Sequence, residues 1–188
     1  MSGKMSDHIP YEKIAIFIDG WNLARVSRDH LNREIDFRRL LSYFSRDFRV
    51  LRAFYYIGED TDEQENNKQH SFLTWMRRNG YKVITRPIKV FLNERGEKEK
   101  KADFDADIAI DMFDLADKID RAVLFSGDGD FTKVIDRIGM KGVRTHVFAY
   151  WGRGKGPTAP ELMEAADEFT DLAEVMDEIG KVYAPNPS

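Results

Sequence analysis

Short apolar runs alternate along the chain with stretches in which apolar residues recur three and four positions apart. The runs are typical of strands buried on both faces of a sheet, and they lie at 13–18, 50–57, 121–126 and 143–149. The helical spacing predicts amphipathic helices at 37–48, 62–79, 105–118, 130–140, 161–166 and 172–179. Residues 81–92 are predicted to be extended, and 93–96 to form a hairpin turn.

This alternation predicts the α/β class, with a mostly parallel central sheet covered by helices on both faces, which is a three-layer αβα sandwich. The 188-residue chain has no internal repeat and no linker long enough to separate domains. We therefore expect a flexible N-terminal segment at 1–12, a single domain at 13–180 and a C-terminal tail at 181–188.

Aspartates follow two of the predicted strands, at the edge where an open parallel sheet binds its ligands. Asp19 comes directly after the first run, and Asp128 and Asp130 lie in a tight turn after 121–126. Three more stand at the start of the helix predicted from 105, namely Asp103, Asp105 and Asp107. If the two strands are neighbours, the aspartates that follow them converge at one edge.

Clustered carboxylates repel one another, and a divalent cation removes that repulsion. The chain has no cysteine and its four histidines are scattered, so the donors are oxygens, which favour Mg²⁺ or Mn²⁺ over Zn²⁺. Such ions polarise a phosphoryl oxygen and activate water. This chemistry suits hydrolysis of a phosphodiester.

Each aspartate also has a structural interpretation. Asp19 and Asp130 suit helix N-caps or turn positions, and Asp103 could cap the helix that follows it. Asp111, four residues after Asp107 and on the same helix face, could be a solvated helix residue or a further ligand. The functional interpretation depends on the set, because several acids are predicted at the same edge.

Other site classes fit the residues poorly. The segment 103–107 imitates an EF-hand loop, but Ile108 stands where that loop needs glycine. A haloacid-dehalogenase-type phosphatase needs a second acid at the position of Trp21, and a Rossmann nucleotide binder needs more glycines than Gly20 after the first strand. The segment 124–128 does not match the G-x-S-x-G turn of serine hydrolases.

Composition restricts the setting of the protein. No apolar stretch approaches the roughly 20 residues that span a bilayer, and the polar N-terminus lacks the apolar core of a signal peptide. The absence of cysteine excludes disulfides and thiolate sites. We expect a cytoplasmic protein without a membrane partner. The net charge of -4 argues against coating of nucleic acid by bulk electrostatics but permits an acidic metal site.

Three segments carry a resemblance to a known family. Residues 16–23 read IFIDGWNL, 101–111 read KADFDADIAID and 126–131 read SGDGDF. They resemble the three motifs of the NYN domain, in its LabA-like branch within the PIN-like nuclease superfamily, and 160–172 resembles the closing segment of that branch. The resemblance extends over about residues 13–175.

The resemblance implies a PIN-like fold and RNA as substrate. It implies metal binding by Asp19, Asp105, Asp128 and Asp130. Asn22 matches a polar residue that orients substrate or a metal-bound water, and Ser126 matches a small hydroxyl residue that we assign to the substrate side. Many relatives carry glycine near 102–103, which leaves Asp103, Asp105 and Asp107 as alternative ligands, and we choose Asp105.

An acidic protein that binds RNA needs local basic groups. Candidates are Arg25, Arg28 and Lys101, followed by Lys98, Lys100, Arg153 and Lys155. Trp21 and Trp151 could stack on unpaired bases, and packing is the alternative role for Trp21. None of the four histidines has an evident partner in the sequence.

The sequence thus predicts a metal-dependent ribonuclease in which Asp19, Asn22, Asp105, Asp128 and Asp130 form the catalytic set. A metal-activated water would hydrolyse RNA phosphodiester bonds, in single-stranded or structured RNA, and leave a 5′-phosphate. The alternative is a catalytically silent regulatory protein of the same fold that binds RNA or a protein partner. A homodimer is also compatible with the sequence.

Overall fold

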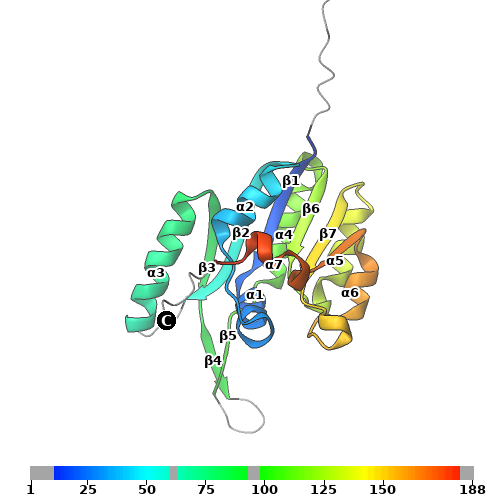
Figure 1. Cartoon of the computed structure of the whole chain (residues 1–188). Coiled ribbons are helices and arrows are strands. Elements are labelled where there is room, and N and C mark those ends of the chain that lie inside the picture. Colours follow the sequence, from blue (N-terminus) through cyan, green and yellow to red (C-terminus); the bar gives the residue numbers. More distant parts are fainter. Residues whose placement is uncertain (1–10, 60–62, 93–97, 183–188) are drawn as a thin grey trace, which may run out of the picture.

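The central element is a parallel sheet. A computed structural model describes residues 11–59, 63–92 and 98–182, and the side chains of these residues except 63–67 and 89–101. Its main sheet has six parallel strands in the order β3-β2-β1-β6-β7-β8 (Figure 1). They are β1 (Lys13–Asp19), β2 (Arg49–Glu59), β3 (Tyr81–Pro87), β6 (Arg121–Phe125), β7 (Arg144–Ala149) and β8 (Glu168–Asp171). The predicted α/β class and parallel central sheet are confirmed.

Helices cover both faces of this sheet (Figure 1). One face carries α1 (Gly20–Val26), α2 (Phe37–Ser45), α3 (Glu63–Arg78) and α7 (Leu172–Ile179), with the π-helical turn η1 (Ser27–Leu31) after α1. The other face carries α4 (Asp105–Leu115), α5 (Thr132–Gly139) and α6 (Pro160–Ala165). Short 3-10 turns are η2 (Ala116–Lys118), η3 (Gly129–Phe131) and η4 (Gly152–Gly154).

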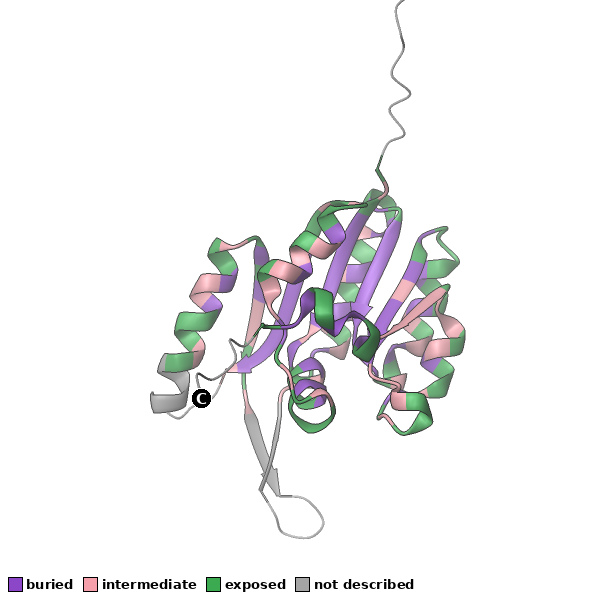
Figure 2. Cartoon of the chain, in the orientation of Figure 1, coloured by how far each residue is buried: buried purple, intermediate pink, exposed green. Residues whose placement is uncertain are grey.

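Side chains of β1 alternate between two apolar cores. Ile14, Ile16 and Ile18 enter the core under α1, α2, α3 and α7, whereas Ala15 and Phe17 enter the core under α4, α5 and α6. All five are fully buried, as expected for a central strand that neighbours cover on both faces. Figure 2 shows the same gradient from the buried strands to the exposed outer surfaces of the helices.

Two parts of the fold differ from the sequence prediction. The extended segment 81–92 is broken at Ile88, and β4 (Lys89–Leu92) leaves the main sheet to pair antiparallel with β5 (Lys98–Lys101). This two-stranded ribbon projects from the end of the sheet at which β1 gives way to α1 (Figure 1). The turn predicted at 93–96 lies outside the described residues.

Strand β8 was not predicted, because it contains one apolar residue, Phe169, and its burial is only partial. It pairs parallel to β7 at the edge of the sheet. The segment 151–160, between β7 and α6, contains η4. The helices predicted at 105–118 and 130–140 each include a 3-10 turn at one end. These turns tighten helix ends locally without changing the topology.

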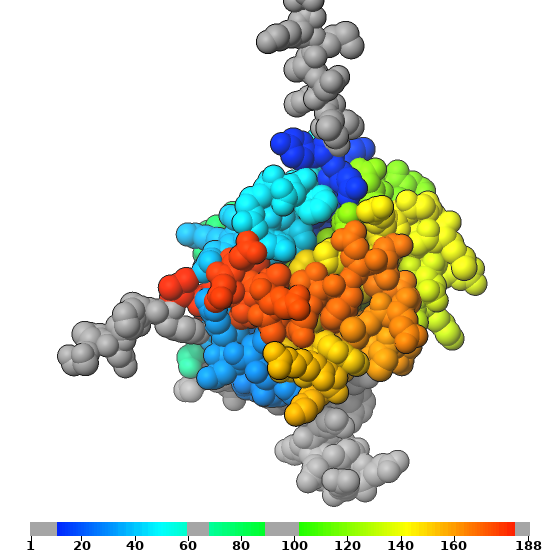
Figure 3. Space-filling view, turned by 45° about the vertical axis from the view of Figure 1, so that its right-hand side comes forward, coloured from blue at the N-terminus to red at the C-terminus, as the bar shows by residue number. Residues whose placement is uncertain are grey.

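The C-terminal helix α7 closes one face of the sheet. Figure 3 shows it between α2 and the chain that follows β1. An isolated bridge joins Ile35 to Gly180, and the guanidinium of Arg39 donates to the carbonyl oxygens of Gly180 (2.9 Å) and Asp177 (2.6 Å). Residues after α7 therefore lie beside the loop that precedes α2.

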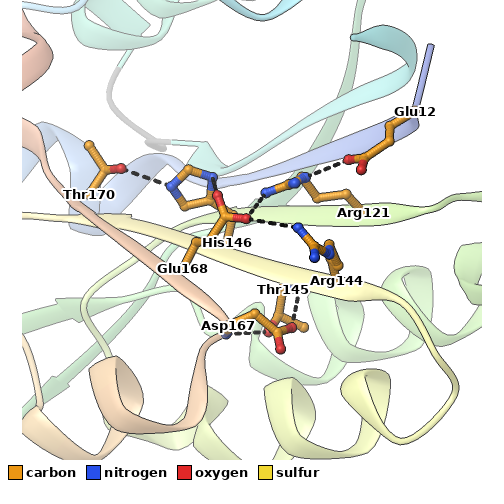
Figure 4. A network of polar contacts seen from close by, with 8 residues as sticks. All are labelled: Glu12, Arg121, Arg144, Thr145, His146, Asp167, Glu168 and Thr170. Carbon is orange, nitrogen blue, oxygen red and sulfur yellow. Dashed lines mark hydrogen bonds and ion pairs between the residues drawn. The ribbon is translucent and has the colours of Figure 1, made fainter. Parts of the chain in front are cut away.

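An ion network around the buried side chain of Arg121 holds β8 to the amino ends of β6 and β7 (Figure 4). The guanidinium of Arg121 lies 2.7 Å from a Glu168 carboxylate oxygen and donates to Glu12 at 3.0 Å. His146 Nε2 lies 2.8 Å from the Thr170 hydroxyl, and its Nδ1 lies 3.5 Å from Glu168. His146 therefore does have partners, which come from the strand that the sequence pattern did not reveal.

Within the described parts of the chain, no helix has the length and apolar character needed to cross a bilayer.

The position of His146 predicts an acid-sensitive fold. Burial lowers the pKa of His146 from 6.5 to about 4, with Arg121 acting in the same direction and Glu168 against it. Below pH 6.5 the unfolded chain binds a proton that the folded protein rejects until about pH 4, so stability falls as pH drops through this window. At pH 5 we expect the loss to be about 1–2 kcal/mol.

Urea unfolding at pH 7.5 and pH 5 measures this loss for the parent protein and for His146→Gln, which removes the titrating ring. The pH dependence should shrink in His146→Gln and persist in the matched control His70→Gln, because His70 is exposed on α3. Equal pH dependence in both variants would assign the acid sensitivity to other groups.

Candidate functional site

The neighbouring strands β1 and β6 bring the first and third sequence motifs to one edge of the sheet. Ile18 pairs with Phe125 in the parallel register, so Asp19 and Ser126 follow at the same level. After β1 the next strand, β2, lies on one side of this pair, and after β6 the next strand, β7, lies on the other side. This reversal is the switch point at which open α/β sheets bind ligands.

Three carboxylates gather at this edge. Asp105, Asp128 and Asp130 each offer an oxygen, and these oxygens lie within 4.8 Å of one another. Asp105 is partly buried at the first turn of α4, while Asp128 and Asp130 are exposed in the turn after β6. The prediction that acids from separate segments meet at the strand ends is therefore realised for these three.

Asp19 is linked to this group through the hydroxyl of Ser126 and the charge of Asp128. The Ser126 hydroxyl donates to Asp19 Oδ2 at 3.3 Å, and the Asn22 backbone N–H donates to Asp19 Oδ1 at 3.0 Å. Burial raises the pKa of Asp19, these two hydrogen bonds lower it, and the charge of Asp128 raises it. Asp19 is thus the N-cap of α1 and also an electrostatic neighbour of the cluster. Metal binding by Asp19 stays a prediction.

Asp105 carries the largest electrostatic effect in the cluster. Burial, followed by the neighbouring Asp103, Asp128 and Asp19 charges, raises the pKa of Asp105 to about 7. Crowded carboxylates retain protons in this way when no cation compensates their charge. The donor set therefore suits a hard divalent cation that takes oxygen ligands.

Asn22 and Ser126 connect the motifs. Asn22 Oδ1 accepts from the Gly127 backbone N–H at 3.2 Å, and Ser126 Oγ accepts from the Asp128 N–H at 3.3 Å. Ser126 is 2% exposed, so its hydroxyl holds Asp19 and Asp128 in place from the protein interior. The substrate contacts expected for Ser126 and Asn22 stay predictions.

The three aspartates near the start of α4 have different surroundings. Asp103 Oδ1 accepts from the Asp105 N–H at 3.1 Å, which satisfies a free donor at the helix start. Asp107 accepts from Arg86 at 2.6 Å, and Asp111 accepts from the Tyr56 hydroxyl at 2.7 Å. Asp111 is therefore neither freely solvated nor part of the cluster, because α4 turns it toward β2. Of the three alternatives for the middle motif, Asp105 is the one grouped with Asp128 and Asp130.

The sequence suggested Asp130 as an N-cap of the helix that follows it, but Asp128 provides the N-cap instead, at the start of η3. Asp128 Oδ1 accepts from the Asp130 N–H at 3.0 Å and begins η3, whereas the cap position of α5 is occupied by Phe131 without a side-chain hydrogen bond. The 3-10 turn moves the start of α5 two residues along the chain. The carboxylate of Asp130 consequently points to the cluster rather than to the helix backbone.

The predicted substrate residues are placed as follows. Trp21 is 47% exposed at the first turn of α1, next to Asp19. Arg25 and Arg28 are exposed, and Arg28 donates to its neighbour Asp29 at 2.7 Å. The backbone of Lys101 ends β5, and its side chain lies outside the described residues.

Sequence reasoning missed the close backbone contacts that shape this edge. A Cβ atom on Gly20 would lie 2.6 Å from the Tyr56 carbonyl oxygen and 2.7 Å from the Tyr55 ring, so only glycine fits after Asp19. A Cβ atom on Gly127 would lie 2.9 Å from the Thr158 hydroxyl. Gly20 and Gly127 belong to the sequence motifs, but their contact partners come from β2 and from Thr158 before α6.

Known proteins are similar to this chain over most of its length. The model of the NYN domain matches residues 13–173. The chain is 34% identical over 179 residues to the "Low amplitude and bright protein LabA" of Synechococcus elongatus, covering 93% of this chain and 91% of that protein. It also resembles the crystal structure of a Vibrio parahaemolyticus protein of unknown function, with a TM-score of 0.75, 27% identity and coverage of 94% of this chain and 99% of the other. With its parallel sheet and its acidic edge, this chain belongs to the NYN domain family.

Proposed function

We propose that this protein is a metal-dependent ribonuclease. The observation that carries the proposal is the grouping of Asp105, Asp128 and Asp130 within 4.8 Å at the switch point of the sheet. Membership of the NYN family and similarity to LabA support an RNA-related function, because NYN domains fall within the PIN-like nucleases. We extend the domain to residues 13–180, so that it includes α7.

Asp105, Asp128 and Asp130 would hold Mg²⁺ or Mn²⁺, and we assign Asp19 as the fourth acidic ligand. When bound, such an ion supplies charge stabilisation for a phosphoryl oxygen and lowers the pKa of water. Ser126 and the Asn22 N–H fix the Asp19 carboxylate, so its charge stays directed at the same place. Asn22 Oδ1 also holds the Gly127 backbone, which keeps the turn of Asp128 against α1.

The reaction that fits this site is hydrolysis. The oxygen of water forms a bond to phosphorus while the bond from phosphorus to the 3′ oxygen breaks, which leaves a 5′-phosphate and a 3′-hydroxyl. Around the acids, exposed Trp21, Arg25 and Arg28 are candidates for contact with bases and phosphates, and Lys101 at the end of β5 is a fourth.

Removing one carboxylate from the cluster tests the reaction. With labelled single-stranded and structured RNA, we expect cleavage in Mn²⁺ or Mg²⁺ and none in EDTA. Asp128→Asn and Asp19→Asn should each lower the rate on the order of 100-fold or more, because both remove negative charge that positions the ion. Ser126→Ala, which removes the hydrogen bonds of the hydroxyl to Asp19 and to the Asp128 N–H but no carboxylate, should cost about 10–100-fold.

Asp114→Asn is the matched control, since Asp114 is an exposed acid on α4 away from the cluster. It should cleave RNA like the parent protein. Cleavage that persists in EDTA, or that survives both Asp128→Asn and Asp19→Asn, would contradict the proposal. RNA that is bound and left intact in every metal would identify the protein as a regulatory binder of the same fold.

The crowded carboxylates also predict a stability effect that does not require turnover. At pH 8 in EDTA, Asp105→Asn should raise the melting temperature, because it removes one charge from a partly buried acidic group. Mn²⁺ should raise the melting temperature of the parent protein by linkage and leave Asp105→Asn largely unchanged. Thermal unfolding followed by circular dichroism measures both shifts.

For this measurement Asp107→Asn serves as the comparison, because Asp107 is paired with Arg86. Losing that ion pair should lower the melting temperature and preserve the response to Mn²⁺. An equal Mn²⁺ response in Asp105→Asn and the parent protein would remove Asp105 from the ligand set.

A further inference from the structure

A groove opens beside the acidic edge, on the face of the sheet covered by α1, α2 and α3. Its volume is about 890 Å³, within the range of ligand-binding clefts. It is lined by Gly20, Leu23, Ala24 and Ser27 from α1 and η1, by residues 32–38 before and within α2, and by Tyr55, Phe72 and Trp75 from β2 and α3. Figure 1 shows these elements together on one face of the sheet.

Aromatic rings form the floor and one wall of this groove. The centroid of the Phe72 ring lies 5.7 Å from that of Phe37, 5.9 Å from that of Tyr55 and 6.5 Å from that of Trp75, to which it is nearly parallel. Phe72 is nevertheless 36% exposed, so part of its ring is uncovered at the groove. Accessible ring surface of this kind stacks on unpaired bases of any sequence.

Cationic side chains stand at the same groove. Arg28, Arg33, Arg38 and Lys181 line it together with the acids Glu34 and Asp36. Arg28 is paired with Asp29, Arg33 with Asp177 and Lys181 with Glu34. Arg38 lies 5.2 Å above the Trp75 ring and, within the described residues, makes no ion pair at 4 Å or less. A guanidinium in this position is available to a phosphate.

The groove and the acidic edge share a backbone segment. Gly20 lines the groove and directly follows Asp19. Tyr55 lies against Gly20 from below, and its ring forms part of the groove wall. The groove therefore begins one residue along the chain from Asp19.

We propose that this groove binds an unpaired nucleotide of the RNA substrate, beside the phosphodiester that the acidic site cleaves. The base stacks on the exposed part of the Phe72 ring, and Arg38 contacts an adjoining phosphate. A base inside a duplex cannot present its face to these rings, so the substrate class is RNA that is single-stranded next to the cleaved bond. This inference rests on the proposed ribonuclease function, and it adds the site that selects single strands.

Binding can be measured apart from cleavage. The full chain carrying Asp128→Asn is titrated against a short labelled single-stranded RNA and against the same strand in a duplex, with fluorescence anisotropy as readout. Adding Phe72→Ala should weaken binding of the single strand about tenfold, since one stacked base is lost, and should leave duplex binding unchanged. Melting temperatures show which variants are folded.

Phe113→Ala is the matched control, because Phe113 has a similar exposed fraction, 38%, and lies on α4 beneath the other face of the sheet. It should bind both RNAs like the parent. A second variant, Arg38→Ala, should reduce the salt dependence of binding by about one phosphate contact, whereas exposed Arg137→Ala on α5 should not. Arg38 is exposed, so this variant should fold even if Phe72→Ala does not.

Three results would overturn the proposal. They are equal single-strand affinity in Phe72→Ala and Phe113→Ala, an equal loss for duplex and single strand, and no binding of single-stranded RNA by the parent protein. The proposed nucleotide binding in the groove and the proposed nuclease activity can be rejected independently. Loss of single-strand binding in Phe72→Ala without metal-dependent cleavage in the wild-type chain would support the groove and reject the nuclease, and the reverse pattern would reject the groove alone.

Discussion

Parallel pairing between β1 and β6 joins two strands that lie far apart in the sequence, and the candidate site exists only where they meet. The pair Ile18 and Phe125 sets the level at which both strands end. One residue later the chain supplies Asp19 on one strand and the Ser126 turn on the other, linked by a 3.3 Å hydrogen bond. A slip of one residue in this register would turn the side chains of β1 to the opposite faces of the sheet and separate these groups.

The acidic edge holds carboxylates of like charge close together, which is electrostatically unfavourable. Asp105, Asp128 and Asp130 lie together, and burial, followed by the charges of Asp103, Asp128 and Asp19, raises the pKa of Asp105 to about 7. The surrounding hydrogen bonds include donation from backbone N–H groups to carboxylates, as in the caps formed by Asp19 and Asp128. Structural capping and the proposed metal binding therefore use the same residues, because a helix start offers donors that hold a carboxylate in place.

The groove and the acidic edge differ in how they are built. The acids come from motifs that stand out in the sequence, whereas the groove combines aromatic residues of α2, α3 and β2 that each look like ordinary core positions. Phe72 lies in the predicted helix at 62–79 and is partly exposed because α3 lies at the end of the face, beside β3. The ion network around Arg121 and β8 was equally hidden, since its members are distributed over β6, β7 and β8.

The sequence by itself determined the α/β class, the positions of the central strands and the acids that follow them, because continuous apolar runs and strand-end aspartates are local signals. It left Asp103, Asp105 and Asp107 as alternatives, and it could not assign Asp111 or His146 a partner. Tertiary structure decided these points. The rotation of α4 places Asp105 with Asp128 and turns Asp111 to Tyr56, and the weakly apolar β8 is held at the sheet edge by Arg121 and Glu168. Such choices depend on contacts between distant segments, which no pattern along a single chain contains.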